Sequence, residues 1–162
     1  MPNDEREPFY VGEYQHTIDT KHRITVPKKW RFQGDEADIY VAWARPEGYV
    51  AVYPPNQIKI FRDKINQIPE SDPRKQVMLR RLFGKAHQFG CDGNGRIMLS
   101  DKLVEQAQLK KNVTLVGLGE TFSIWSTERY QKEEEDFDVL EAMQEFGIWS
   151  PYLSLSFSPN YS

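Results

Sequence analysis

The sequence has little cysteine, little histidine and no long apolar run, and these absences exclude several classes of protein. Cys91 is the one cysteine among 162 residues, which excludes an intramolecular disulfide framework and an all-cysteine zinc site. No stretch reaches the roughly 20 consecutive apolar residues that a membrane-spanning helix needs. The polar, acidic N-terminus does not resemble a signal peptide, so we expect a cytoplasmic protein that does not enter a membrane.

Motifs for catalysis and for metal binding are also scarce. His87 and Cys91 lie four residues apart, but no second ligand pair accompanies them, so we predict no metal site. The sequence contains no phosphate-binding loop, nucleophile elbow or dinucleotide fingerprint, so we predict no cofactor and no enzymatic activity. A small hydrolase that uses Asp19, Asp92 and His16 stays open as an alternative.

The charged residues are strongly segregated along the chain. The net charge is −3, and the 39% hydrophobic and 28% charged residues are typical of a globular domain. Residues 19–33 carry five basic side chains against one acid, a net charge of +4, and residues 59–85 carry eight against three, a net charge of +5. Residues 128–145 carry two against eight, a net charge of −6. Basic segments that share one face could therefore bind an anionic partner.

An internal repeat divides the chain into two similar halves. The sequence D-T-K-H-R-I-T-V at residues 19–26 matches D-G-N-G-R-I-M-L at residues 92–99, at an offset of 73. The alternating segments 49–53 and 121–125 match at an offset of 72. Two copies of this length indicate a duplicated small domain rather than a solenoid.

Each half is predicted to contain a hairpin, a short helical stretch and two further strands. The hairpins are residues 14–18 with 23–26, around a turn at 19–22, and residues 86–91 with 96–99, around Asn94-Gly95. Pro27 opens one helical stretch and Ser100 caps the other. The further strands are residues 39–44 with 50–53, and residues 113–118 with 122–125.

Three longer helices are predicted from apolar spacing and from capping residues. The first has an apolar stripe at Ile58, Phe61, Ile65 and Ile68; the second runs from Ser71-Asp72-Pro73 to about Ala86, with Met78 and Leu82 on its apolar face; the third begins at Thr127, with Tyr130, Phe137, Leu140 and Met143 facing inward. The serine-rich end of the chain is expected to be flexible. The alternation at residues 153–157 leaves edge pairing with another subunit open.

The D-x-x-x-R pattern at the centre of each repeat is the most informative motif. Asp19 and Asp92 each begin a turn, where an aspartate accepts hydrogen bonds from the backbone that follows. Arg23 and Arg96 leave these turns, and each could pair with its own aspartate. Guanidinium groups held on hairpins also suit phosphates and guanine edges. Both interpretations can hold together if the aspartate orients the arginine.

The two motifs also resemble a known family. The sequences D-T-K-H-R-I-T-V-P at 19–27 and R-R-L-F-G-K-A-H-Q-F-G-C-D-G-N-G-R-I at 80–97 resemble the signatures of the MraZ family of bacterial transcriptional regulators. The resemblance covers roughly residues 10 to 146. It implies an α+β fold with two pseudo-symmetric halves similar to the AbrB swapped hairpin, intertwined around a small β-barrel or sheet core with flanking helices.

The resemblance also implies a function. Members of the family are cytoplasmic, nucleoid-associated regulators of the division and cell-wall gene cluster. They form ring-shaped homo-oligomers on repeated elements of double-stranded promoter DNA. For this chain we expect an N-terminal half at 10–85 with a basic helical connector, a C-terminal half at 86–146 with an acidic helix, and flexible tails at 1–9 and 147–162.

The candidate DNA-binding residues are basic side chains of the two motifs and their flanks, namely Lys21, His22, Arg23, Lys28, Lys29, Arg31 and Arg96, with Asp19, Asp92 and Gly95 in structural roles. His22 stands where the family usually has glycine, so a positive φ there would be unusual. Because basic residues follow only the first motif, we expect Arg23 to contact DNA and Arg96 to be held by Asp92. The alternative is a non-catalytic protein–protein scaffold in which both Asp–Arg pairs are structural.

Overall fold

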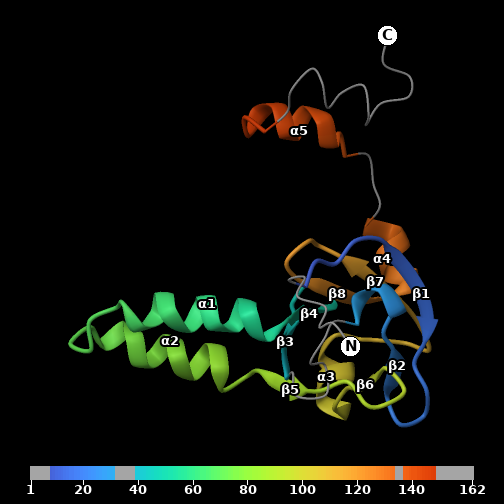
Figure 1. Ribbon diagram of the computed structural model, residues 1–162, viewed down its shortest axis with the longest axis horizontal. Coiled ribbons are helices and arrows are strands. Elements are labelled where there is room, and N and C mark those ends of the chain that lie inside the picture. Colours follow the sequence, from blue (N-terminus) through green and yellow to red (C-terminus); the bar gives the residue numbers. More distant parts are fainter. Residues whose placement is uncertain (1–7, 32–38, 134–136, 149–162) are drawn as a thin grey trace, which may run out of the picture. The chain divides into compact units, whose positions relative to one another are not determined.

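The chain folds into a mixed α+β structure, described here from a computed structural model for residues 8–31, 39–133 and 137–148 (Figure 1). The strands are β1 Glu13–Thr17, β2 Arg23–Thr25, β3 Tyr40–Arg45, β4 Tyr49–Tyr53, β5 His87–Phe89, β6 Arg96–Met98, β7 Asn112–Gly117 and β8 Phe122–Ser126. The helices are the 3-10 helix η1 Lys28–Trp30, α1 Pro55–Asn66, α2 Pro73–Phe83, α3 Asp101–Gln106, α4 Thr127–Glu133 and α5 Val139–Glu145. The predicted α+β class is confirmed.

The chain divides after Gln131 into two compact units. The first unit holds all eight of these strands, η1, α1 to α3 and most of α4. The second unit holds α5, which begins where the Asp138 carboxylate accepts a hydrogen bond of 3.0 Å from the backbone N–H of Glu141. The sequence repeat predicts another division, into halves at 10–85 and 86–146, and that division stays a prediction.

The main sheet has six strands in the order β1-β7-β8-β4-β3-β5. In the repeat, β1, β7 and β8 are equivalent to β5, β3 and β4. The order therefore reads the same from either end of the sheet when each strand is replaced by its equivalent. His16 of β1 lies opposite Val113 of β7, and Tyr40 of β3 lies opposite Phe89 of β5. Under the repeat offset of 73, His16 is equivalent to Phe89 and Val113 is equivalent to Tyr40, so the two pairs are equivalent. The first strand of each half therefore extends the sheet of the other half.

A second, two-stranded sheet joins the central motifs of the two halves. β2 and β6 are antiparallel, with Ile24 opposite Ile97, and both isoleucine side chains are fully buried. The pairing continues beyond the strands, because the Val26 N–H donates to the Gly95 carbonyl over 2.8 Å and the Leu99 N–H donates to the His22 carbonyl over 2.9 Å. We call this two-stranded sheet the central ribbon.

The two predicted hairpins are confirmed as strand–turn–strand units, but within each unit only residues next to the turn pair, such as Cys91 with Ile97. Residues 14–18 and 23–26 flank a tight turn, as do residues 86–91 and 96–99, but the strands on either side of each turn pair mainly with the other half. Local pairing of the first turn is limited to bonds such as that from the Asp19 N–H to the Arg23 carbonyl, at 3.1 Å. Sequence alternation predicts which face of a strand is buried but does not identify its partner.

Residues from both halves form one hydrophobic core. Three buried aromatic rings, of Tyr10, Trp30 and Phe122, contact one another with centroid distances of 5.0 to 5.5 Å. The indole N–H of Trp30 donates to the Val11 carbonyl over 3.1 Å, so this large side chain is buried without an unsatisfied donor. Burial of this cluster requires the two halves together.

Helix α1 agrees with its predicted apolar stripe, whereas helix α2 differs from the prediction in its buried residue and in its end. In α1 the buried side chain is Ile65, which agrees with the apolar stripe. In α2, however, the buried residue is Lys75, whose ammonium donates to the Ile68 carbonyl over 3.1 Å and pairs with Glu70, whereas Met78 is 37% exposed. α2 also ends at Phe83, before Ala86.

The predicted third helix is wrong, because it is two helices. α4 does begin at Thr127, but the Asp138 cap starts a separate helix. Phe137 therefore lies outside both helices, and its side chain is 74% exposed. The segment 153–157 and most of the predicted tails lie outside the described residues.

Exchange of β1 and β5 between the halves predicts that neither half folds alone. Cutting the chain between residues 70 and 71, at the connection of α1 to α2, should give two fragments that each lack cooperative thermal unfolding. In the first fragment β1 has lost β7, and in the second β5 has lost β3. Mixing the fragments should restore a cooperative transition in circular dichroism. A first fragment that unfolds cooperatively by itself would contradict the swapped arrangement.

Candidate nucleic-acid interface

The first D-x-x-x-R turn is held by the carboxylate of Asp19. One oxygen accepts hydrogen bonds from the backbone N–H groups of Lys21, at 2.9 Å, and Arg23, at 2.8 Å. The other oxygen accepts from the Nε atom of Arg23 at 2.7 Å. The same carboxylate therefore fixes the turn and orients the arginine that leaves it.

The second turn repeats this arrangement. One oxygen of Asp92 accepts from the backbone N–H groups of Asn94, at 2.8 Å, and Arg96, at 2.9 Å, and the other accepts from Arg96 Nε at 3.0 Å. The expectation that Asp92 holds Arg96 is confirmed. The accompanying expectation that Arg23 differs from Arg96 in this respect is wrong, because both arginines are held in the same way.

Each turn contains one residue with a positive φ, at equivalent positions of the repeat. Gly95 has φ of +76°, which glycine adopts without steric cost, and His22 has φ of +59°. His22 thus adopts the positive φ that is unusual for a residue other than glycine. The imidazole Nδ1 lies 2.8 Å from a carboxylate oxygen of Asp101, so the histidine makes a contact that glycine could not make.

Hydrogen bonding changes the acidity of both aspartates. The backbone N–H of Arg23 is the main cause that holds the pKa of Asp19 below its ordinary value, and the N–H of Arg96 does the same for the pKa of Asp92. Burial lowers the pKa of His16. A carboxylate with a lowered pKa and both oxygens occupied is a weak base at neutral pH, which disfavours the hydrolase alternative.

The swapped fold places the basic segment 28–31 beside the second turn rather than the first. Val26, just before that segment, is bonded to Gly95. The Nε and Nη2 atoms of Arg31 donate to the Val26 carbonyl over 3.1 and 2.9 Å. A Cβ atom on Gly95 would lie 2.2 Å from Cζ of Arg31, so this guanidinium covers the glycine.

The first turn has the start of α3 as its neighbour. Leu99 is bonded to the His22 carbonyl, and Asp101 pairs with the His22 side chain. Each turn therefore lies beside the helical segment of the opposite half. Lys28 and Asp101 occupy equivalent positions of the repeat and carry opposite charges.

This exchange overturns the reason for expecting Arg23, rather than Arg96, to contact DNA, which was that basic residues follow only the first motif in the sequence. With its bonded neighbour, the first turn includes the charged residues Lys21, Arg23 and Lys102 against Asp19 and Asp101. Among the described residues, the second turn and the segment bonded to it include Arg96, Lys28, Lys29 and Arg31 against Asp92. The stronger positive field is thus expected at the second turn, because a neighbour in space matters more than a neighbour in sequence.

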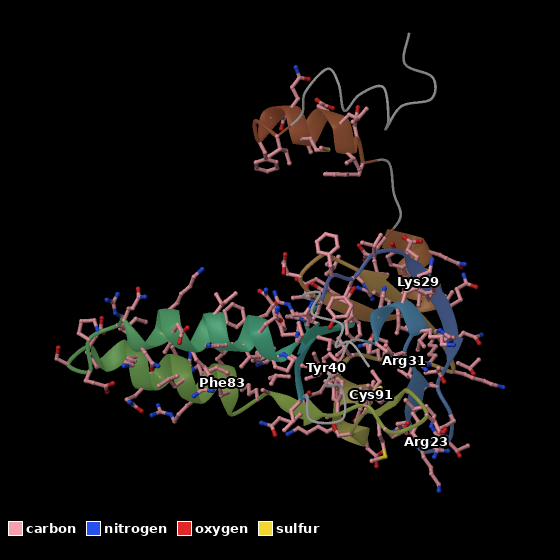
Figure 2. The ribbon with its side chains drawn as sticks, in the orientation of Figure 1. Arg23, Lys29, Arg31, Tyr40, Phe83 and Cys91 are labelled. Carbon is pink, nitrogen blue, oxygen red and sulfur yellow. The ribbon has the colours of Figure 1, made fainter. Side chains whose placement is uncertain are left out.

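The central ribbon presents its arginines on the face opposite the core. Arg23 and Thr25 alternate with buried Ile24, and Arg96 and Met98 alternate with buried Ile97. In the view of Figure 2, Arg31 lies between Lys29 and Arg23, which are well apart. Lys21, Lys28 and Lys29 are exposed, and the arginines are half-buried. The structure therefore distributes the candidate residues around the ribbon and both turns.

Comparison with known proteins identifies the family. Residues 82–146 match the family model described as "MraZ protein, putative antitoxin-like". A protein of Pediococcus pentosaceus named transcriptional regulator MraZ is 31% identical over 145 residues, which cover 86% of this chain and all of that protein. A protein of the same name from Clostridium acetobutylicum is 29% identical over 144 residues, with the same coverage. The chain belongs to the MraZ family.

The MraZ family match extends across both repeats. The family model covers the second turn, α3, β7 and β8, and the two relatives each align with 86% of the chain, which is more than either repeat alone. The predicted family resemblance is confirmed.

Two features of this MraZ family member were not predicted from the sequence. They are the cover that Arg31 places over Gly95 and the contact of Asp101 with His22. The repeat itself held a signal for the second feature, because an offset of 73 places Asp101 where the first half has Lys28. No signal for the first feature is visible, since Arg31 corresponds to an apolar residue, Val104.

The described residues contain no cluster of three or more potential metal ligands. Among these same residues, no helix combines the length and the apolar character required to cross a membrane.

Gly95 should be more sensitive to substitution than its neighbour Gly93. Gly95→Ala should lower the free energy of unfolding by about 1–2 kcal/mol, because alanine is strained at positive φ. Gly93→Ala should change it by less than about 0.5 kcal/mol, because no atom lies within 4 Å of the added Cβ. Urea denaturation measures both. In the Arg31→Ala background, the part of the cost due to the guanidinium should disappear. Equal costs at the two glycines would contradict this description of the turn.

Proposed function

We propose that this chain is a transcription regulator that binds double-stranded DNA in a sequence-specific manner through the outward face of the central ribbon and the two D-x-x-x-R turns. We also propose that it acts as a ring-like homo-oligomer on repeated promoter elements of division and cell-wall genes, in the cytoplasm and at the nucleoid. No cofactor is required for this function.

The observation that carries the proposal is the equivalent anchoring of Arg23 and Arg96. Each guanidinium uses Nε to bond an aspartate, and among the described residues no protein group bonds to its two Nη atoms. A free pair of Nη donors suits a bidentate contact with the O6 and N7 atoms of guanine or with a phosphate. Anchoring reduces the side-chain freedom that binding must remove.

The dimensions of a two-stranded ribbon also suit DNA. The major groove of B-form DNA admits an antiparallel pair of strands, whose outward side chains then reach base edges. The lysines at positions 21, 28 and 29 are exposed beside the ribbon, where they can neutralise phosphates. An oligomer would present several ribbons to consecutive DNA elements, and linked contacts strengthen binding without any new interaction.

A gel-shift experiment on the DNA upstream of the protein's own gene tests the proposal. A regulator should shift this DNA at concentrations where a scrambled duplex of equal length is not shifted. A scaffold with purely structural Asp–Arg pairs would shift neither duplex. Equal shifts of both duplexes would contradict sequence-specific binding.

Arg23 and Arg96 should both contribute to DNA binding. Arg23→Ala and Arg96→Ala should each weaken specific binding by about tenfold or more, since a bidentate arginine contributes about 1–3 kcal/mol. The loss for Arg96→Ala should be at least as large, because Lys28 and Lys29 belong to the segment that is bonded to the second turn. Arg45→Ala is the control, because Arg45 is an exposed arginine that pairs with Glu47 outside the ribbon. Fluorescence anisotropy provides the affinities. Normal binding by both ribbon variants would contradict the proposed interface.

Binding should weaken steeply as salt increases. Each neutralised phosphate contributes about −0.9 to the slope of log K against log salt, so several basic side chains should give a slope steeper than about −3. Lys28→Ala with Lys29→Ala should make the slope shallower by up to about 2 if both lysines contact phosphates. A salt series in anisotropy measures the slope. A nearly flat dependence would count against an electrostatic interface.

A further inference from the structure

The outward face of the central ribbon carries two uncharged side chains between its arginines. The register places Arg23 opposite Met98 and Thr25 opposite Arg96. The four side chains therefore form a square in which the arginines occupy one diagonal and Thr25 and Met98 the other. Opposite residues of an antiparallel pair have Cβ atoms about 4.5–5.5 Å apart, so each uncharged side chain is adjacent to an arginine.

Both uncharged side chains are available for contact. Met98 is 60% exposed and Thr25 is exposed, whereas their strand neighbours Ile24 and Ile97 are completely buried. Among the described residues, the Thr25 hydroxyl has no hydrogen-bond partner. Packing within the chain therefore does not explain the choice of threonine and methionine at these two positions.

The chemistry of the two side chains matches one feature of the major groove. Thymine carries a 5-methyl group there, and apolar side chains or the methyl group of threonine can contact it. The thioether of methionine is flexible and polarizable, which allows it to follow an irregular apolar surface. A guanidinium, by contrast, is suited to guanine. The ribbon thus combines two guanine-type readers with two thymine-type readers.

We propose that Thr25 and Met98 are specificity-determining residues that contact thymine methyl groups beside the bases contacted by Arg96 and Arg23. This inference rests on the proposed DNA-binding function and assigns base recognition to two further positions. Thr25 and Met98 are not equivalent in size, so the two thymine positions need not tolerate the same replacements.

Selection from a randomised duplex library with the full-length protein provides the test site. Each thymine of the enriched sequence is then replaced by deoxyuridine, which lacks the 5-methyl group and keeps its hydrogen-bonding edge. Wild type should bind about three- to tenfold more weakly when the contacted thymines are replaced, since such apolar contacts are modest. Replacement of thymines outside the contacted positions should have little effect.

Variants then assign each thymine to a side chain. Met98→Gln should remove the effect of uridine at one position, whereas Met98→Leu should keep it. Thr25→Ser, which loses the methyl group, should remove the effect at the other position, whereas Thr25→Val should keep it. Met78→Gln and Thr17→Ser are matched controls, because Met78 and Thr17 are exposed residues outside the central ribbon. Circular dichroism should show that all variants are folded.

The outcomes separate this inference from the function on which it rests. Loss of uridine sensitivity in Met98→Gln and Thr25→Ser, with the controls unchanged, supports the assignment. An enriched site whose uridine sensitivity is the same in wild type and in these two variants overturns the assignment while sequence-specific binding stands. If wild type enriches no sequence, the proposed function fails, and the assignment fails with it.

Discussion

The pairing of β2 with β6 is the interaction on which the rest of the structure depends. It brings Ile24 and Ile97 together in the core and places the two D-x-x-x-R turns at opposite ends of one ribbon. It also carries Val26 to Gly95 and Leu99 to His22, which gives each turn the helical segment of the other half as its neighbour. Core formation and arrangement of the basic surface are therefore consequences of the same hydrogen-bond ladder.

The aspartate of each turn connects the backbone to the arginine side chain that we propose as a DNA contact. Without Asp19 or Asp92, the N–H groups of the turn would need water as their acceptor, and the arginine would lose its anchor. The structural and functional interpretations of the Asp–Arg pairs are therefore compatible. A carboxylate that stabilises the turn also restricts the orientation of the arginine, because it binds the guanidinium through Nε.

The sequence supported the fold class, the repeat, the turns and the family well, because these depend on local residue types. Asp at the start of a turn, Gly95 in its last position and Ser100 as the cap of α3 all act within a few residues. Strand partners were not predictable in this way. The same alternation in β1 is compatible with β2 or β7, and the choice depends on how the two halves bury their apolar faces together.

The errors in the candidate site have the same origin. Segment 28–31 follows the first motif in the chain, but the ladder places it beside the second, so a charge count along the sequence assigned it to the wrong turn.

The break between α4 and α5 was also missed, although Asp138 is a good capping residue, because the apolar spacing continued across it. Periodicity alone does not detect an interruption that preserves the phase.

The two halves differ at equivalent positions, such as Lys28 and Asp101 or His22 and Gly95. This difference has a consequence for how the subunit can be oriented on a duplex. A homodimer of identical hairpins looks the same after a half-turn, so it cannot distinguish the two directions along a duplex. Duplication within one chain removes that restriction, because each half can acquire its own residues. A single subunit of this protein is thus a polar object, and its two orientations on an asymmetric duplex are not equivalent.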